Sequence, residues 1–171
     1  MIQSLADRRA AFLYRAGGFA ANNPPNLLRL ARALLGDDAL HFVGRHGERG
    51  ALVTSLSGAG CRIYLHRGAS VEENAFAIAR GIARWDVDRG GPVTDAARLA
   101  LSVALPFEVM ESRYAAGRTS EQIASAHHLP VEIVRSREAL LVEPASATRL
   151  RAAPAFVYVG ASTTATVRGA S

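Results

Sequence analysis

The fold of this chain is decided by residues 70–84, which read SVEENAFAIARGIAR. Ser70 and Glu73 make a capping-box pattern, in which each side chain can bond a free backbone N–H group at the start of a helix. The apolar residues that follow recur at helical spacing and predict one packed face: Phe76, Ile78, Ala79, Ile82 and Ala83. We therefore expect a helix that runs from Ser70 to about Trp85 or Val87 and lies in the centre of the core.

Two helices and three short strands are expected before this central helix. The first helix covers Ile2 to Phe19, and the second starts at Asn22-Asn23-Pro24-Pro25 and closes at Gly36. Three segments rich in β-branched and aromatic residues follow, separated by glycine-rich stretches: Ala39 to Val43, Ala51 to Ser55 and Arg62 to Leu65. We predict that they form a small antiparallel three-stranded sheet.

Helices are also expected after the central one, at Thr94 to Val103, at Phe107 to Ala115, and as a short pair over residues 119–141. The tail holds one apolar run, Ala155 to Val159, which we interpret as an added strand before a disordered end. The sequence thus predicts an α+β fold in three parts: a core over residues 1–112, a helix-turn-helix-like segment over 113–145, and a tail over 146–171.

Composition places the chain among folded globular proteins, because 49% of its 171 residues are apolar. No stretch comes near the roughly 18 uninterrupted apolar residues of a membrane helix. The N-terminal region carries Asp7, Arg8, Arg9 and Arg15 where a signal peptide would be apolar. We expect a cytoplasmic protein with no membrane partner.

Lysine is absent, so all 20 basic residues other than histidine are arginines, and the formal net charge is +5. Beside abundant alanine and glycine, this pattern is more typical of a GC-rich genome than of phosphate recognition. The arginines are scattered and form no dense basic run. A nucleic-acid partner is therefore compatible with the composition but not favoured by it.

Cysteine and histidine offer no obvious catalytic set. Cys61 is the only cysteine and lies in an apolar segment, which favours a buried, inert thiol. No two histidines are four residues apart, so we expect core or surface roles for all of them: His41, His46, His66, His127 and His128. Nucleotide-binding glycine loops and the Gly-x-Ser-x-Gly motif are also missing from the sequence.

Three motifs, taken in order, resemble the ImmA/IrrE family of zinc metallopeptidases. Residues 76–84 (FAIARGIAR) are similar to the family's Phe-x-Ile-Ala-His-Glu-Leu-Gly-His helix. Residues 95–106 (DAARLALSVALP) look like its Glu-Ala-Asn-x-Phe-Ala-x-x-Leu-Leu-Met-Pro segment, and residues 123–130 (IASAHHLP) resemble its Leu-Ala-x-x-Phe-x-Val-Ser segment. The resemblance covers about Pro24 to Leu141 and implies a zincin-like, metallopeptidase-like core over residues 1–112.

The same resemblance implies that the zinc site is lost. Arg80 and Arg84 stand at the two histidine positions, Gly81 at the glutamate position, and Asp95 at the third ligand position. Arginine stays protonated and has no lone pair to give to a metal, and glycine cannot act as the general base. We therefore predict no zinc, no cofactor and no peptidase activity.

Three arrangements of the altered site stay open. Arg80 and Arg84 lie four residues apart and would repel each other, so an ion pair with Asp95 could replace the metal crosslink. The arginines could instead be solvated, or they could hold a carboxylate or phosphate as an anion pocket.

The C-terminal helix pair has the spacing of a helix-turn-helix, with Arg135 and Arg137 as candidate nucleic-acid contacts. Glu132 and Glu138 on the same helix oppose such binding, and His128 replaces the usual turn glycine. We hypothesise a catalytically inactive, regulatory protein-binding module, because active members of the family cleave or control helix-turn-helix repressors. The partner would then be a transcriptional regulator. The alternatives are a nucleic-acid-binding regulator and an anion-binding protein.

Overall fold

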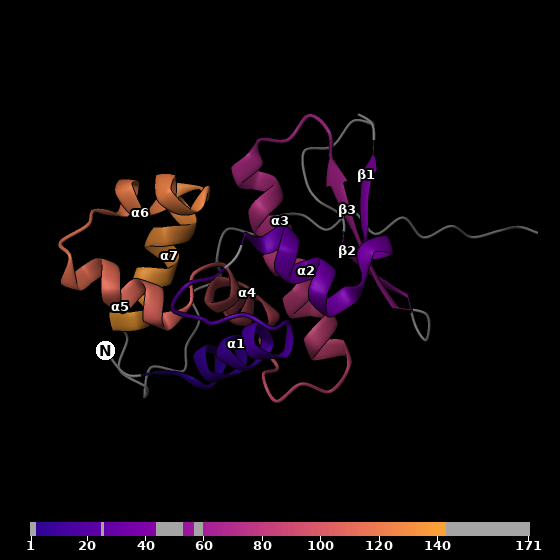
Figure 1. Ribbon diagram of the computed structural model, residues 1–171, viewed down its shortest axis with the longest axis horizontal. Coiled ribbons are helices and arrows are strands. Elements are labelled where there is room, and N and C mark those ends of the chain that lie inside the picture. The colour runs from indigo at the N-terminus through magenta and orange to yellow at the C-terminus, as the bar shows by residue number, and fades with distance from the viewer. Residues whose placement is uncertain (1–2, 25, 44–52, 57–59, 143–171) are drawn as a thin grey trace, which may run out of the picture.

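The computed structural model describes residues 3–24, 26–43, 53–56 and 60–142 (Figure 1). His46, the expected strand at Ala155 to Val159 and the tail over residues 146–171 lie outside the described residues. Within them the elements follow in this order: α1 (Leu5–Ala16), α2 (Leu27–Leu35), the 3₁₀ helix η1 (Asp37–Ala39), β1 (Leu40–Val43), β2 (Val53–Leu56), β3 (Gly60–His66), α3 (Val71–Asp88), α4 (Ala96–Ala104), α5 (Phe107–Ala115), α6 (Ser120–His127) and α7 (Val131–Val142). The fold is α+β and mostly helical.

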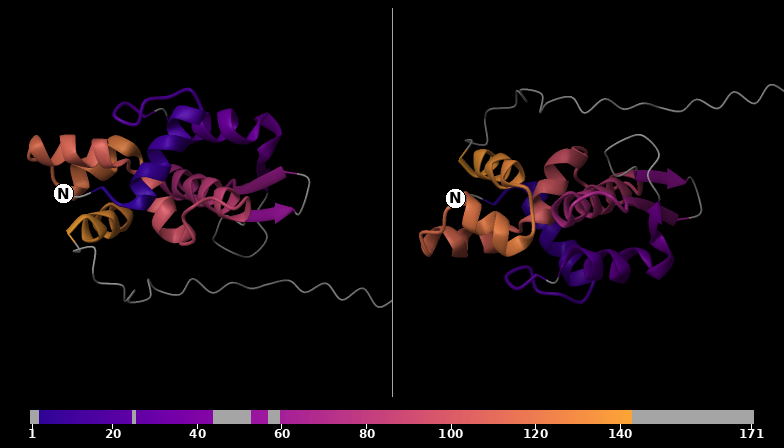
Figure 2. Two further views of the ribbon diagram at one scale, coloured as in Figure 1. Left: turned by 90° about the horizontal axis from the view of Figure 1, so that it is seen from below. Right: turned by 90° about the horizontal axis from the view of Figure 1, so that it is seen from above.

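The sheet and the last three helices lie at opposite ends of an elongated molecule (Figure 2). Figure 2 shows the sheet at one end and the group α5, α6 and α7 at the other, with α3 and α4 between them. No helix in the described ranges is both long and apolar enough to cross a membrane.

The sheet is mixed, so the prediction of an antiparallel three-stranded sheet was wrong in one pairing. The strand order is β1-β3-β2, with β2 antiparallel to β3 and β1 parallel to β3. Along β3, Cys61, Ile63 and Leu65 alternate with more exposed residues and are buried against the helices. Since β3 is central, the two other strands flank it and do not pair with each other.

Helix α3 lies in the core, as its sequence predicts. The Ser70 hydroxyl accepts from Glu73 N at 3.1 Å and the Glu73 carboxylate accepts from Ser70 N at 2.9 Å, which confirms the capping box. The helix then continues to Asp88, one residue past the later of its two predicted ends, Val87, and three past Trp85. Its buried face packs against β3 on one side and against α4 on another.

Helix α1 is fixed to the core by two polar contacts between helices. Tyr14 is buried and its hydroxyl donates to the carbonyl of Val103 in α4 at 2.7 Å. Arg9 donates two hydrogen bonds to Asp86 in α3, from Nε at 2.9 Å and from a terminal nitrogen at 2.6 Å. Such forked arginine–carboxylate contacts fix orientation as well as distance.

Helix α2 begins later than the sequence suggested. Its cap is Asn26, whose side-chain oxygen accepts from Arg29 N at 2.9 Å. A residue that precedes a proline disfavours the helical conformation, and Asn23 precedes Pro24, so the helix does not start at Asn22 or Asn23.

The C-terminal helices are continuous with the rest of the core. One cluster of buried apolar residues includes Ala6 in α1 and extends to Leu141 in α7. The expected boundary between residues 112 and 113 falls inside α5. His128 ends α6 in the left-handed conformation, at φ 51°, where glycine is more usual. The helix pair is therefore packed as part of the fold.

Candidate functional site

Arg80 and Arg84, the arginines expected at former zinc-ligand positions, lie on the outer side of α3. Arg84 is exposed, and its side chain forms an ion pair with Asp88, one turn along the same helix, at 2.9 Å. Arg80 lies one turn before Arg84 and is half-buried. The neighbouring positions toward the sheet and α4 are buried: Ala77, Ile78, Ala79, Gly81, Ile82 and Ala83.

Gly81 points into the core. A Cβ atom built on this glycine would lie 2.4 Å from Cδ1 and 2.5 Å from Cγ1 of Ile63 in β3. Normal contact between carbon atoms is about 3.5–4.0 Å, so no side chain fits here unless Ile63 moves. The position that resembles the family's catalytic glutamate is therefore a close helix–strand contact.

Asp95 caps α4. Its carboxylate accepts from Arg98 N at 3.0 Å, which satisfies one of the free backbone donors at the start of that helix. Arg84 forms its ion pair with Asp88, so this arginine does not provide the expected pairing of Arg80 and Arg84 with Asp95, which stays a prediction for Arg80. Arg84 and Asp95 each have a local structural partner instead.

Histidine and cysteine are dispersed over the fold. Among the residues that the structure describes, no group of three or more His, Cys, Asp or Glu side chains could hold a metal ion. His41 stacks on Tyr64 with ring centroids 5.4 Å apart, and His66 accepts from Gly68 N at 3.0 Å. Cys61 is buried as predicted, and burial together with the nearby charge of Asp88 raises the pKa of its thiol.

The two arginines proposed to contact nucleic acid have different environments. Arg135 is exposed on α7 and pairs with Glu121 of α6 at 2.9 Å. Arg137 is only 1% exposed and is directed into the protein, where it forms an ion pair with Asp7 of α1. The interpretation of Arg137 as a surface contact was therefore wrong, because this side chain already has a buried anionic partner.

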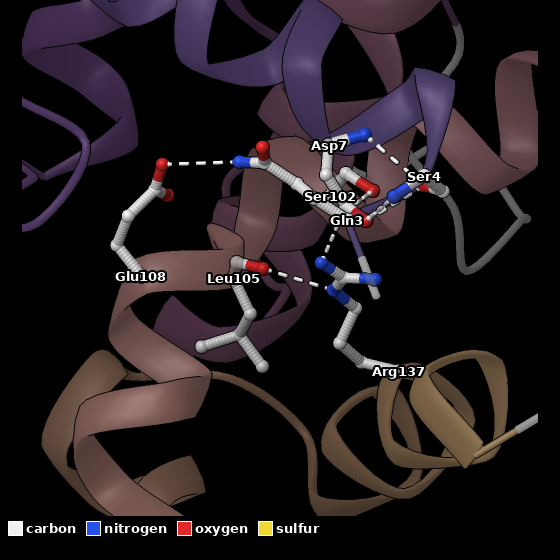
Figure 3. Close-up of polar contacts among 7 residues, drawn as sticks. All are labelled: Gln3, Ser4, Asp7, Ser102, Leu105, Glu108 and Arg137. Atoms are coloured by element: carbon white, nitrogen blue, oxygen red, sulfur yellow. Dashed lines mark hydrogen bonds and ion pairs between the residues drawn. The ribbon is translucent and has the colours of Figure 1, made fainter. Parts of the chain in front are cut away.

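A buried polar network surrounds this ion pair (Figure 3). Asp7 accepts hydrogen bonds from Arg137, from the Ser4 hydroxyl and backbone N–H at 2.7 Å each, and from the Ser102 hydroxyl at 2.9 Å. Arg137 also donates from Nε to the carbonyl of Leu105 at 3.0 Å. Burial alone would raise the pKa of Asp7, but Arg137 and the hydroxyl donors outweigh it and hold the pKa below its ordinary value. The network joins α1, α4 and α7.

Sequence reasoning missed this network although two signals were present. Ser4 and Asp7 have capping-box spacing, which the structure confirms at the start of α1. Arg137 lies three residues after Val134 and four before Leu141, both buried, so helical periodicity puts it on the packed face of α7. A charged residue on such a face needs an anionic partner nearby.

Two shallow hollows mark the surface of the described chain. One lies beside the turn after α1 and is lined by Arg15, Phe19 and Glu108 among others. The second lies between η1 and the sheet and includes Asp38, His41 and Cys61. Neither hollow includes Arg80, Arg84 or Asp95.

Comparison of the chain with protein-family models, with curated proteins and with solved structures gives no match.

Proposed function

We propose that this chain is a non-catalytic relative of the ImmA/IrrE metallopeptidases that acts by binding another protein. Two observations support this proposal. The family is inferred from the resemblance of three segments, residues 76–84, 95–106 and 123–130. The loss of catalysis is inferred from the chemistry of the residues that replace the zinc ligands and the general base. The partner we expect is a transcriptional regulator, by analogy with the repressors that active members of the family cleave or control.

The contact between Gly81 and Ile63 carries most of this proposal. A peptidase of this class needs a glutamate beside its metal-bound water, and that glutamate must face an open cleft. Gly81 faces β3 at a distance too short for a methyl group. This packing supports a scaffold that has adapted to the absence of the base.

The charged groups around α3 give a second line of support. Arg84 is held by Asp88, and Asp95 is held by the first turn of α4. These local contacts would compete with recruitment of the same residues to a metal or to a bound anion. We therefore rank an anion pocket at Arg80 and Arg84 below protein binding.

Nucleic-acid binding through α6 and α7 has less support. Groove recognition needs several exposed cationic or polar side chains on one helix. On α7, Arg137 is buried and Arg135 forms an ion pair with Glu121. The helix pair fits a structural role in the core better than a role in recognition.

The test is to recover the partner and follow its integrity. The full chain, tagged and expressed in its source organism, is crosslinked and purified, and the bound proteins are identified by mass spectrometry. The isolated complex is then incubated for hours with added zinc. We expect a reproducible partner whose intact mass does not change. A partner that is cleaved in the complex, or purifications that repeatedly yield no partner, would contradict the proposal.

A further inference from the structure

The outer face of α1 carries apolar and basic side chains in one line. Leu5, Arg8, Phe12 and Arg15 are spaced by three, four and three residues and are all exposed, Leu5 by 49% and Phe12 by 47%. We call these four residues the α1 stripe. The opposite face of the helix is buried and holds Ala6, Ala10, Leu13 and Tyr14.

The α1 stripe carries two positive charges, those of Arg8 and Arg15. Arg8 and Arg15 take part in none of the ion pairs formed within the described ranges. Arg9, beside the stripe, pairs with Asp86 while its guanidinium lies 4.5 Å from the centre of the Phe12 ring. The face therefore combines two exposed apolar side chains with two available cations, within a chain whose net charge is +5.

A hollow continues the stripe at the C-terminal end of α1. Arg15 forms part of its lining, together with the turn residues Phe19, Ala20 and Ala21. Arg29 lies with its guanidinium 5.6 Å from the centre of the Phe19 ring. Glu108 also borders the hollow, but Gln3 donates to one of its carboxylate oxygens at 3.3 Å and its other oxygen is enclosed (Figure 3). The hollow therefore presents a mostly apolar surface next to Arg15, where a side chain of a partner could bind.

We propose that the α1 stripe is a docking surface for an acidic amphipathic helix of a partner protein. Leu5 and Phe12 lie seven residues apart, or about 10 Å along the helix axis at 1.5 Å per residue. A partner helix laid along α1 presents apolar residues at i, i+3 or i+4, and i+7 with the same spacing. Its carboxylates pair with Arg8 and Arg15, and an apolar side chain enters the hollow beside Phe19.

A helix fits this surface better than a lipid bilayer does. Membrane-surface helices insert a broad apolar face, whereas the α1 stripe offers two separated apolar side chains. The shallow hollow beside Phe19 can receive one protruding apolar side chain, and such side chains often anchor protein interfaces. This inference rests on the proposed protein-binding function and adds the surface and the chemistry of the partner.

The test uses a displayed library of 16-residue helical peptides. Apolar residues are fixed at i, i+4 and i+7, and the flanking positions are randomised among Glu, Lys, Gln and Ser. The full-length protein is the bait, and enriched peptides are synthesised for anisotropy titrations. The stripe variants are Phe12→Ser and Arg8→Glu/Arg15→Glu. The matched control is Arg67→Glu/Arg118→Glu, which reverses two exposed arginines elsewhere. Circular dichroism confirms that each variant is folded.

We expect selection to enrich glutamate, and both stripe variants to weaken binding at least about 10-fold, the scale of an interface anchor. The control should stay within about 2-fold, and added salt should weaken binding. Enrichment of lysine, or binding that the stripe variants leave unchanged, would overturn the inference. So would binding to vesicles of phosphatidylglycerol and phosphatidylcholine that Phe12→Ser abolishes. If the co-purified partner is still retained by both stripe variants, this surface is wrong while the protein-binding function stands.

Discussion

Replacing Gly81 with alanine places a methyl group where Ile63 already lies. The added Cβ would lie 2.4 and 2.5 Å from two carbon atoms of Ile63. Either α3 and β3 must move apart by about 1 Å, or the Ile63 side chain must change its rotamer. Overpacking of this kind costs about 1–3 kcal/mol. Alanine in place of glycine inside a helix gains about 1 kcal/mol. We expect a net loss of about 1 kcal/mol in the free energy of unfolding.

The steric origin of this loss is separated from helix propensity by a double-mutant cycle. Ile63→Ala removes the atoms that clash, at its own cost of about 2–5 kcal/mol for a cavity. In that background Gly81→Ala should stabilise the protein by about 1 kcal/mol, which gives a coupling of about 2 kcal/mol. Ala139→Gly, at an exposed position of α7, measures the propensity difference alone. The assay is urea denaturation followed by circular dichroism. A Gly81→Ala protein that gains stability equally in both backgrounds would refute the close contact.

Other predictions concern buried titratable groups. Arg137→Met leaves the Asp7 carboxylate buried without its cation and should cost about 3–5 kcal/mol in urea denaturation, of which Asp7→Asn/Arg137→Met should recover part. Because the pKa of Asp7 is lowered in the folded state, its contribution to stability is complete above the ordinary pKa of 3.8 and is lost as pH falls through the folded pKa. The free energy of unfolding of Asp7→Asn should therefore lack this loss when it is measured at decreasing acid pH. Burial, with Arg113 and His128, lowers the pKa of His127, so the folded state resists its protonation. The melting temperature should therefore fall as pH drops below about 6.5, and His127→Gln should reduce this slope.

Local sequence signals predicted α3 and α5 well, whereas α1 (Leu5–Ala16) is shorter than the expected Ile2 to Phe19. The capping box of Ser70 and Glu73 and the proline before α5 act within one turn of the chain, and the structure has both helices near their expected ends. The limits of α5, Phe107 to Ala115, were predicted without error. Such signals need no knowledge of the rest of the fold, because the groups that interact are neighbours in sequence.

Interactions between distant segments were harder to predict. The parallel pairing of β1 with β3 depends on which strand takes the central place, which is decided by packing against α3 and not by the strand's own residues. Asp7 and Arg137 are 130 positions apart in the sequence, so no local pattern around either residue predicts that they form an ion pair. At the candidate site, the sequence identified the residues but not their contacts, since Asp95 serves as a helix cap and Gly81 as a packing surface.

Zinc analysis of the full-length protein, purified without chelators from cells supplied with zinc, tests directly the proposal that a metal site has been lost. Asp95→Asn is the matched variant, because asparagine keeps the helix cap while removing the charge of the residue that the resemblance puts at the third ligand position. We predict far less than one zinc ion per chain, and the same content in the variant. One zinc ion per chain that is lost in Asp95→Asn would contradict the proposal that this scaffold has given up its metal.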